Sequence, residues 1–155
     1  MTARPSARSH LRLVIEPTHQ EQQSWYAQAE RDARLFLLRC GHQLSDPSLT
    51  HWVVEQCAEL AWHWRAGRPA WSSLRVGEVW LRLANLHRFF PQPRLVVAFY
   101  ETLLAFLPWL ASQSRLEHPA CRAMLEQLEH VREPMLTRAR EQLATRHRFR
   151  QRVQL

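Results

Sequence analysis

The most regular set of chemically competent side chains is a ladder of four residues, His51, Glu55, Glu59 and His63, at successive four-residue steps. Residues four apart share one face of an α-helix, and carboxylates with imidazoles on helix faces hold metals in helical bundles. Bundle metals lie inside the bundle, whereas these residues lie opposite the apolar stripe of the same segment, which comprises Val53, Cys57, Leu60, Ala61 and Trp64. We therefore expect a solvated face with contacts between His and Glu, and no metal site.

Two Cys/His pairs are close in sequence, Cys40 with His42 and His118 with Cys121. Neither belongs to a CxxC pair, the spacing that makes a zinc site a strong prediction. Cys57 brings the cysteines to an odd number, and all three lie in apolar helical patterns. This usage favours buried thiols in a reducing compartment, so we expect a cytoplasmic protein.

Signatures of nucleotide binding and of nucleophilic catalysis depend on closely spaced glycines. The three glycines, Gly41, Gly67 and Gly77, form no GxGxxG motif, no phosphate-binding loop and no nucleophile elbow. Serine, histidine and acidic residues are present, but their spacing singles out no triad. We therefore expect a protein without enzymatic activity, catalytic residues or cofactor.

The net charge of +7 lies in the two ends of the chain. Residues 1–13 carry three arginines and no acid, and residues 132–155 carry seven arginines and two glutamates, whereas residues 14–131 have eleven arginines and twelve acids. This partition predicts a nearly neutral body with two cationic arms, and such arms bind phosphate backbones independently of sequence. The predicted nucleic-acid-binding residues are Arg4, Arg8, Arg12, Arg138, Arg140, Arg146, Arg148, Arg150 and Arg152.

On a helix, the arginines of the last segment, 137–155, point in all directions, with Phe149 among them as a candidate stacking ring. Charge on all sides is unsuited to packing on a core and suits an arm laid along a phosphate backbone. The alternatives are a frayed, solvated tail, or a segment that binds acidic proteins or anionic lipid.

Two of the seven tryptophans, Trp52 and Trp62, fall on the polar side of the predicted second helix, beside Glu55 and Glu59. Tryptophan is enriched in binding hot spots. If both side chains are exposed, they mark a surface that binds a protein partner. The alternative is that another helix of the same chain covers them.

Capping residues place the first two helices. Thr18 and Glu21 form a capping box, which predicts a helix over 19–40. Residues at three- and four-residue spacing form its predicted inward face, namely Trp25, Ala29, Ala33, Phe36, Leu37 and Cys40. Asp46 as N-cap and Pro47 as the first helical residue predict a second helix that runs to about residue 65.

Prolines limit the next two helices. A third is predicted from Ser72 or Ser73 to residue 90, because Pro91 and Pro93 prevent its continuation. A fourth is predicted over 93–107, where Pro108 kinks or ends it.

A long last segment is predicted to open at a second capping box, Ser114 with Glu117, and to be broken by Pro134 into 115–132 and 135–150. With few glycines for turns between strands, the chain is predicted to be all-α, a single-domain bundle or short array of five to six helices. The predicted core domain is 18–134, between a basic N-terminal arm, 1–17, and an Arg-rich C-terminal helix or tail, 135–155.

Within this pattern, the stretch 77–108 resembles a single tetratricopeptide (TPR) repeat, over about a fifth of the chain. The residues that match the first helix of that family are Trp80, Leu83, Ala84 and His87, and those that match the second are Tyr100 and Pro108. Val96 and Leu103 are bulkier than the small residues that the family has there. The resemblance implies a scaffold that binds a peptide or partner protein; the alternative is a helical hairpin that packs similarly.

The most apolar stretch, 95–111, contains Glu101 and Pro108 and is shorter than the ~20 residues of a spanning helix, so no membrane span is expected. Residues 1–15 are rich in arginine and serine, as mitochondrial targeting peptides are, which is a minor alternative to a cytoplasmic location.

Taken together, these patterns predict a non-enzymatic accessory or structural subunit of a larger assembly. Its body contacts a protein partner, and its arginine arms contact DNA or RNA. The alternative is a TPR-like adaptor or chaperone that binds protein alone, and an enzyme with a helical metal site ranks third.

Overall fold

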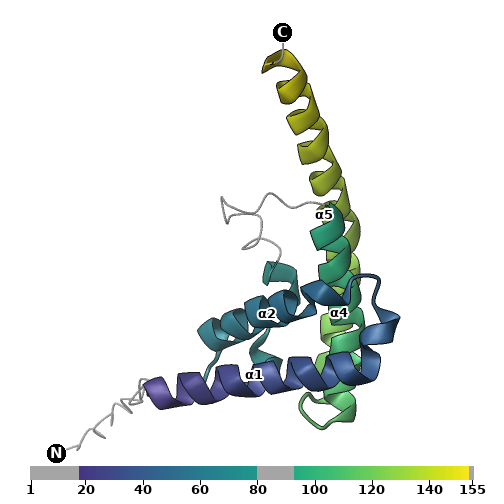
Figure 1. Cartoon of the computed structure of the whole chain (residues 1–155). Coiled ribbons are helices and arrows are strands. Elements are labelled where there is room, and N and C mark those ends of the chain that lie inside the picture. The colour runs from purple at the N-terminus through teal and green to yellow at the C-terminus, as the bar shows by residue number, and fades with distance from the viewer. Residues whose placement is uncertain (1–17, 80–92, 154–155) are drawn as a thin grey trace, which may run out of the picture.

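The computed structural model describes residues 18–79 and 93–153, and over these ranges it consists of helices and turns without a strand (Figure 1). The predicted all-α fold is confirmed. Side chains of the last helix are described as far as Glu141, and again at Ala144. The predicted N-terminal arm, 1–17, with Arg4, Arg8 and Arg12, lies outside the described residues.

The first helix, α1, spans His19–Cys40, as predicted. The capping box is present, because the Thr18 hydroxyl accepts from the backbone N–H of Glu21 and the Glu21 carboxylate accepts from the backbone N–H of Thr18. The buried face of α1 includes the predicted Trp25, Ala29, Ala33 and Phe36. It also includes one residue that the sequence pattern did not place there, Asp32.

The second helix begins later than predicted. A 3₁₀ turn, η1 (Gly41–Gln43), follows α1, a second one, η2, occupies Pro47–Leu49, and α2 spans Thr50–Trp64. Asp46 does not cap a helix with its side chain. Its carboxylate accepts hydrogen bonds from the Ser48 hydroxyl and from Arg94 Nε, the latter at 2.7 Å.

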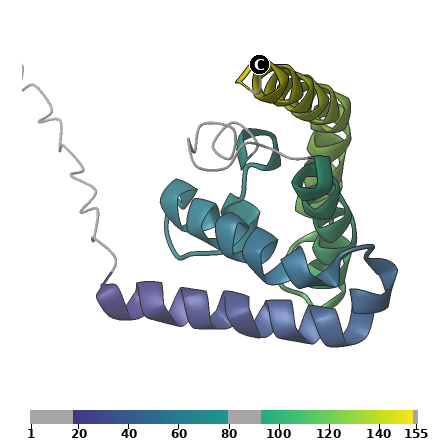
Figure 2. The same cartoon turned by 45° about the horizontal axis from the view of Figure 1, so that its top comes forward.

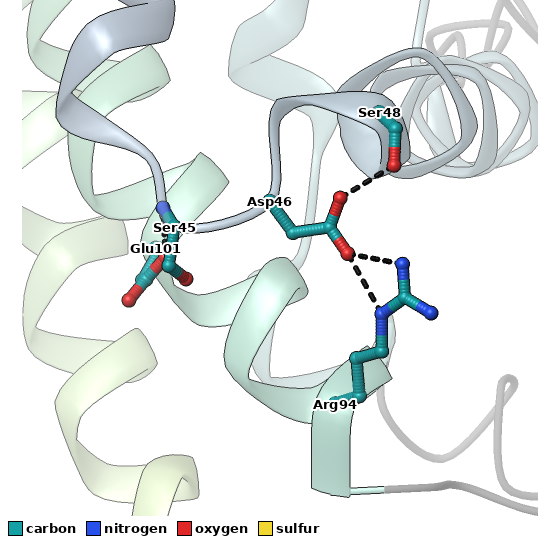
Figure 3. A network of polar contacts seen from close by, with 5 residues as sticks. All are labelled: Ser45, Asp46, Ser48, Arg94 and Glu101. Atoms are coloured by element: carbon teal, nitrogen blue, oxygen red, sulfur yellow. Dashed lines mark hydrogen bonds and ion pairs between the residues drawn. The ribbon is translucent and has the colours of Figure 1, made fainter.

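These contacts belong to a polar network that joins the α1–α2 connection to α4 (Pro93–Ser112), as Figure 3 shows. Beside the pair of Asp46 and Arg94, the Glu101 carboxylate accepts from the backbone N–H of Ser45 at 3.0 Å and from the Ser45 hydroxyl. The hydrogen bond from Ser48 and the guanidinium of Arg94 hold the pKa of Asp46 below its usual value. The connection is therefore anchored to α4 at two points.

The segment after α2 contains a short 3₁₀ turn, η3 (Trp71–Ser73), and helical backbone at 76–79. The start predicted at Ser72 or Ser73 is therefore wrong, since both residues lie in the 3₁₀ turn. The rest of this predicted helix lies outside the described residues, together with the positions matched to the first TPR helix.

Both prolines expected to end helices lie inside them. Pro108 lies within α4, which continues to Ser112, and Pro134 lies within α5, a single helix over His118–Val153. A proline removes the hydrogen bond to the carbonyl four residues earlier, here those of Leu104 and His130. All four residues are exposed, so the interrupted hydrogen bonds lie on the solvent side of each helix, away from its packed side.

Two related predictions are corrected. Pro108 does not close the helix that was matched to the second helix of a TPR repeat. Ser114 does not open α5, because it lies in the α4–α5 turn with a left-handed φ of 58°, and the helix begins at His118.

The helices form two pairs. Helix α1 packs on α2, α4 packs antiparallel to α5, and Figures 1 and 2 show the first pair crossing the second steeply. Rings from three elements meet at the crossing: Phe106 lies 5.2 Å from both Phe36 and Trp71 and 5.8 Å from Trp109. The indole N–H of Trp25 donates to the carbonyl of Ala58 at 2.9 Å and ties α1 to α2. These contacts make one continuous core.

Helix α4 is longer than the stretch considered from sequence. It has 20 residues, and an 18-residue stretch of it has a mean hydropathy of 1.6. This is enough in length and composition to cross a membrane, so the expectation that the helix is too short to span one is wrong. Half of this apolar stretch is buried against the rest of the chain.

The three cysteines are free thiols with different exposures: Cys57 and Cys121 are buried and Cys40 is partly exposed. Burial raises the pKa of the Cys57 thiol to about 12 and also raises that of Cys121. We therefore expect a disulfide-forming reagent at pH 8 to modify Cys40 rapidly and the other two only as fast as the protein opens. Rapid modification of all three thiols in the folded protein would contradict this packing. As a control, unfolding in denaturant should make all three react rapidly.

Candidate interaction surfaces

The C-terminal part of α5 is the candidate nucleic-acid interface. Met135 and Ala139 are buried in the core, so the packed body extends past the domain boundary predicted at residue 134. Beyond Ala139 no described side chain is buried, and Arg138 and Arg140 are exposed. The helix nevertheless continues to Val153, so Arg146, Arg148, Arg150 and Arg152 lie on the same helix.

The C-terminal part of α5 has a definite length. From residue 140 to 153 the helix rises by roughly 20 Å at 1.5 Å per residue. Figure 1 shows it extending beyond the N-terminal end of α4, away from α1 and α2. An extended cationic helix of this length can lie along several successive phosphates of a nucleic acid.

The two tryptophans predicted to bind a partner are not exposed together. Trp62 is only 8% exposed, and Trp52 is partly buried. The Trp62 ring lies 6.5 Å from that of Tyr26 on α1, and the Arg65 guanidinium covers it at 3.5 Å from the ring centroid. The prediction of an exposed aromatic pair is therefore wrong at Trp62.

The reason is that α2 is buried on two sides. The predicted stripe with Val53 and Cys57 faces the core, and Val54, Ala58 and Trp62 form a second buried stripe at four-residue steps against α1. Only one buried face was expected for this helix, so Trp62, which belongs to the second stripe, was assigned to the polar side.

The α1–α2 seam forms a first groove of about 490 Å³. Small apolar side chains make its floor, namely Ala29, Ala33, Val54 and Ala58. Its rim carries Glu30, His51, Glu55 and Glu59, so three of the four residues of the predicted ladder border this groove. The ladder lies on the solvated side as expected: Glu59 approaches His63 at 3.8 Å, and His51 and Glu55 are exposed.

A second groove, of about 460 Å³, follows the α4–α5 seam. Val97, Leu104, Ala105 and Leu136 give it an apolar lining, and Glu101 and Arg132 add one acid and one base. The Arg132 guanidinium lies 5.0 Å from the centroid of the Tyr100 ring. The Tyr100 hydroxyl donates to Glu129 at 2.7 Å, and this hydrogen bond raises the pKa of Tyr100.

A third hollow, of about 540 Å³, lies where α1 meets the α2–η3 connection and the α4–α5 turn. Behind it Asp32, only 1% exposed, accepts from the Trp71 indole N–H at 3.0 Å and from Gln28 at 2.9 Å, and Arg115 approaches at 3.7 Å. Both carboxylate oxygens are engaged, so the arrangement anchors η3 on α1.

Asp32 was not among the residues predicted from sequence, although its position carries a signal. Asp32 is seven residues after Trp25 and four before Phe36, and therefore lies on the buried stripe of α1. A charged residue within an apolar stripe predicts a buried partner, here the indole N–H of Trp71.

Comparison of the chain with protein-family models, with curated proteins and with solved structures gives no match.

Proposed function

We propose that this protein is a non-enzymatic helical subunit of a nucleic-acid-containing assembly, with the arginine-rich end of α5 laid against the phosphate backbone. The observation that carries the proposal is that α5 remains helical to Val153, past Ala139, the last buried position among the described side chains. Packing does not require a helix to continue there, whereas an arm that presents arginines to an extended anion does.

Charge partition supports the same proposal. The body is close to neutral, so long-range attraction to nucleic acid comes from the arms, and the body is left to contact protein. An arginine arm on a neutral body gives affinity without base recognition, since phosphate contacts carry no sequence information.

The test is a salt titration of binding to duplex DNA and to single-stranded RNA. A variant with glutamine at four arm positions, Arg146, Arg148, Arg150 and Arg152, keeps helix propensity and loses four charges. Each lost phosphate contact is expected to lower the slope of log K against log salt by about 0.9 on duplex DNA, so the slope falls by up to about 3.6.

The matched control loses the same charge from exposed positions of the body: Arg31, Arg39, Arg68 and Arg122 are replaced by glutamine. Its slope should stay near that of the wild type. An equal fall of the slope in both variants would contradict binding through the arm and would indicate non-specific attraction to the whole surface. A truncation should remove only 142–155, because a cut at residue 135 would also remove the buried Met135 and Ala139.

An adaptor that binds protein alone is the second candidate function. The two apolar-lined seams, along α1–α2 and along α4–α5, favour it. Wild-type protein that binds neither nucleic acid at about 50 mM salt would contradict the first proposal and favour this one.

A further inference from the structure

Helix α4 carries a second apolar stripe outside the core. One side of the helix packs inward through residues such as Phe99, Leu103 and Phe106. The other side presents Val97, Glu101, Leu104 and Pro108 at positions i, i+4, i+7 and i+11, which share one face of a helix. A helix that is apolar on both sides is normally covered on both.

This second stripe is exposed. Val97 is 38% exposed and Leu104 46%, and they are two of the four large apolar side chains that lie open to solvent among the described residues. Its one acid, Glu101, is turned toward Ser45, as Figure 3 shows. The stripe therefore offers an apolar ridge that spans 12 residues, from Val97 to Pro108.

Helix α5 contributes the other side of the same face. Leu136 lines the α4–α5 groove beside Val97. Leu125, which lies nearer the start of α5, is partly buried against the core. Between these two leucines lie Glu129 and Arg132, both held near Tyr100. The α4–α5 face thus has apolar ends, with an acid and a base in its middle.

We propose that this face binds the same face of a second copy of the chain, so that two α4–α5 hairpins form an antiparallel four-helix bundle. A two-fold interface must be self-complementary. Apolar ends meet apolar ends under such a rotation, and Arg132 of each copy meets the acids Glu101 and Glu129 of the other. Helical hairpins with short turns form bundles in this way.

The size of the face fits a dimer of moderate affinity. Twenty residues of α4 span about 30 Å, and two helices about 10 Å wide give a footprint of roughly 600 Å² per copy. Stable interfaces bury about 800 Å² per partner, so we expect association in the micromolar range. A membrane is a poorer occupant, because Arg132 and Glu129 would enter the apolar layer with the leucines.

The dimer goes beyond the proposed function and does not require it, because the arm takes no part in the contact. Since the two α5 helices run in opposite directions, the two arginine arms leave the bundle at opposite ends. One dimer would therefore contact nucleic acid at two separated places, which raises its apparent affinity without new contacts.

The first test measures mass against concentration by sedimentation velocity for the wild type, Leu104→Glu, Val97→Glu and the control Leu38→Glu. Leu38, on the outer side of α1, is 82% exposed, so the control adds the same charge at an open apolar position elsewhere. We expect both α4 variants to raise the dimer dissociation constant at least about tenfold and the control to leave it unchanged. Circular dichroism and thermal unfolding check that all variants fold.

A charge exchange gives a second, independent measurement. Arg132→Glu and Glu129→Arg each place like charges across the two-fold axis and should each be monomeric, whereas their mixture should form a heterodimer. Three results would overturn the proposal. They are a wild type that stays monomeric at several hundred micromolar, a Leu38→Glu variant whose dimer dissociation constant rises as much as that of the α4 variants, and loss of the dimer on deletion of 142–155. Binding of monomeric wild type to phosphatidylcholine vesicles, weakened by Leu104→Glu, would assign the face to a membrane.

Discussion

Replacement of Asp32 by alanine is expected to lower the free energy of unfolding by about 3 kcal/mol, because it leaves a buried indole N–H without an acceptor. Asp32 is 1% exposed and accepts from Trp71 and Gln28. The loss of the Trp71 hydrogen bond carries most of the effect. Arg115 adds little, since it approaches at 3.7 Å and its side chain is 42% exposed.

The measurement is urea unfolding of Asp32→Ala, Trp71→Phe and the double variant. Because Phe has no N–H to satisfy, the double variant should be less destabilised than the sum of the two singles, by about 1 to 2 kcal/mol. Additive losses would show that the hydrogen bond does not couple the two residues. Glu30→Ala, on the exposed side of α1, is the control and should change stability by less than about 0.5 kcal/mol.

The elements that could be predicted from sequence are those with local signals. Thr18 and Glu21 satisfy each other across one turn, so the start of α1 depends on four adjacent residues and was predicted correctly. The apolar period of α1 likewise identified Trp25 and Phe36 as core residues. Both signals are independent of how the helices pack.

The failures come from tertiary packing. A proline is tolerated inside a helix where the carbonyl that it frees lies on the solvent side, and Leu104 and His130 are both exposed. Asp46 had the right type and position for an N-cap, but Arg94, distant in sequence, competes for its carboxylate. No local pattern contains such a contact.

The same distinction between local signals and tertiary packing applies to the candidate interaction surfaces. The charge of the arm is a property of composition, so the arginines of α5 were identified, whereas the continuity of the helix past Pro134 was not. Trp62 was assigned to solvent because one stripe of α2 had already been assigned to the core, and the second buried stripe appears only when α1 is packed against it. The α4–α5 groove needs both helices side by side, so sequence alone did not indicate it.

Replacement of Phe106 by alanine is expected to cost about 3 to 5 kcal/mol, the range for a large aromatic side chain removed from a core. Phe106 is 1% exposed and its ring touches those of Phe36, Trp71 and Trp109, which come from α1, η3 and α4. Removal therefore opens a cavity at the crossing of the two helix pairs. Phe106→Leu fills part of it and should cost less, and Leu104→Ala, two residues away and exposed, should cost less than about 0.5 kcal/mol.

Chemical denaturation of Phe106→Leu, alone and with Asp32→Ala, tests whether the crossing behaves as one unit. Trp71 lies between the two sites, since its ring packs on Phe106 and its N–H donates to Asp32. Once either neighbour is replaced, Trp71 can shift and so reduce the effect of the second replacement. The double variant should therefore lose less free energy of unfolding than the sum of the two single losses. Strict additivity would mean that Trp71 stays fixed by Trp25, whose ring lies 5.0 Å away, and that the two sites are independent.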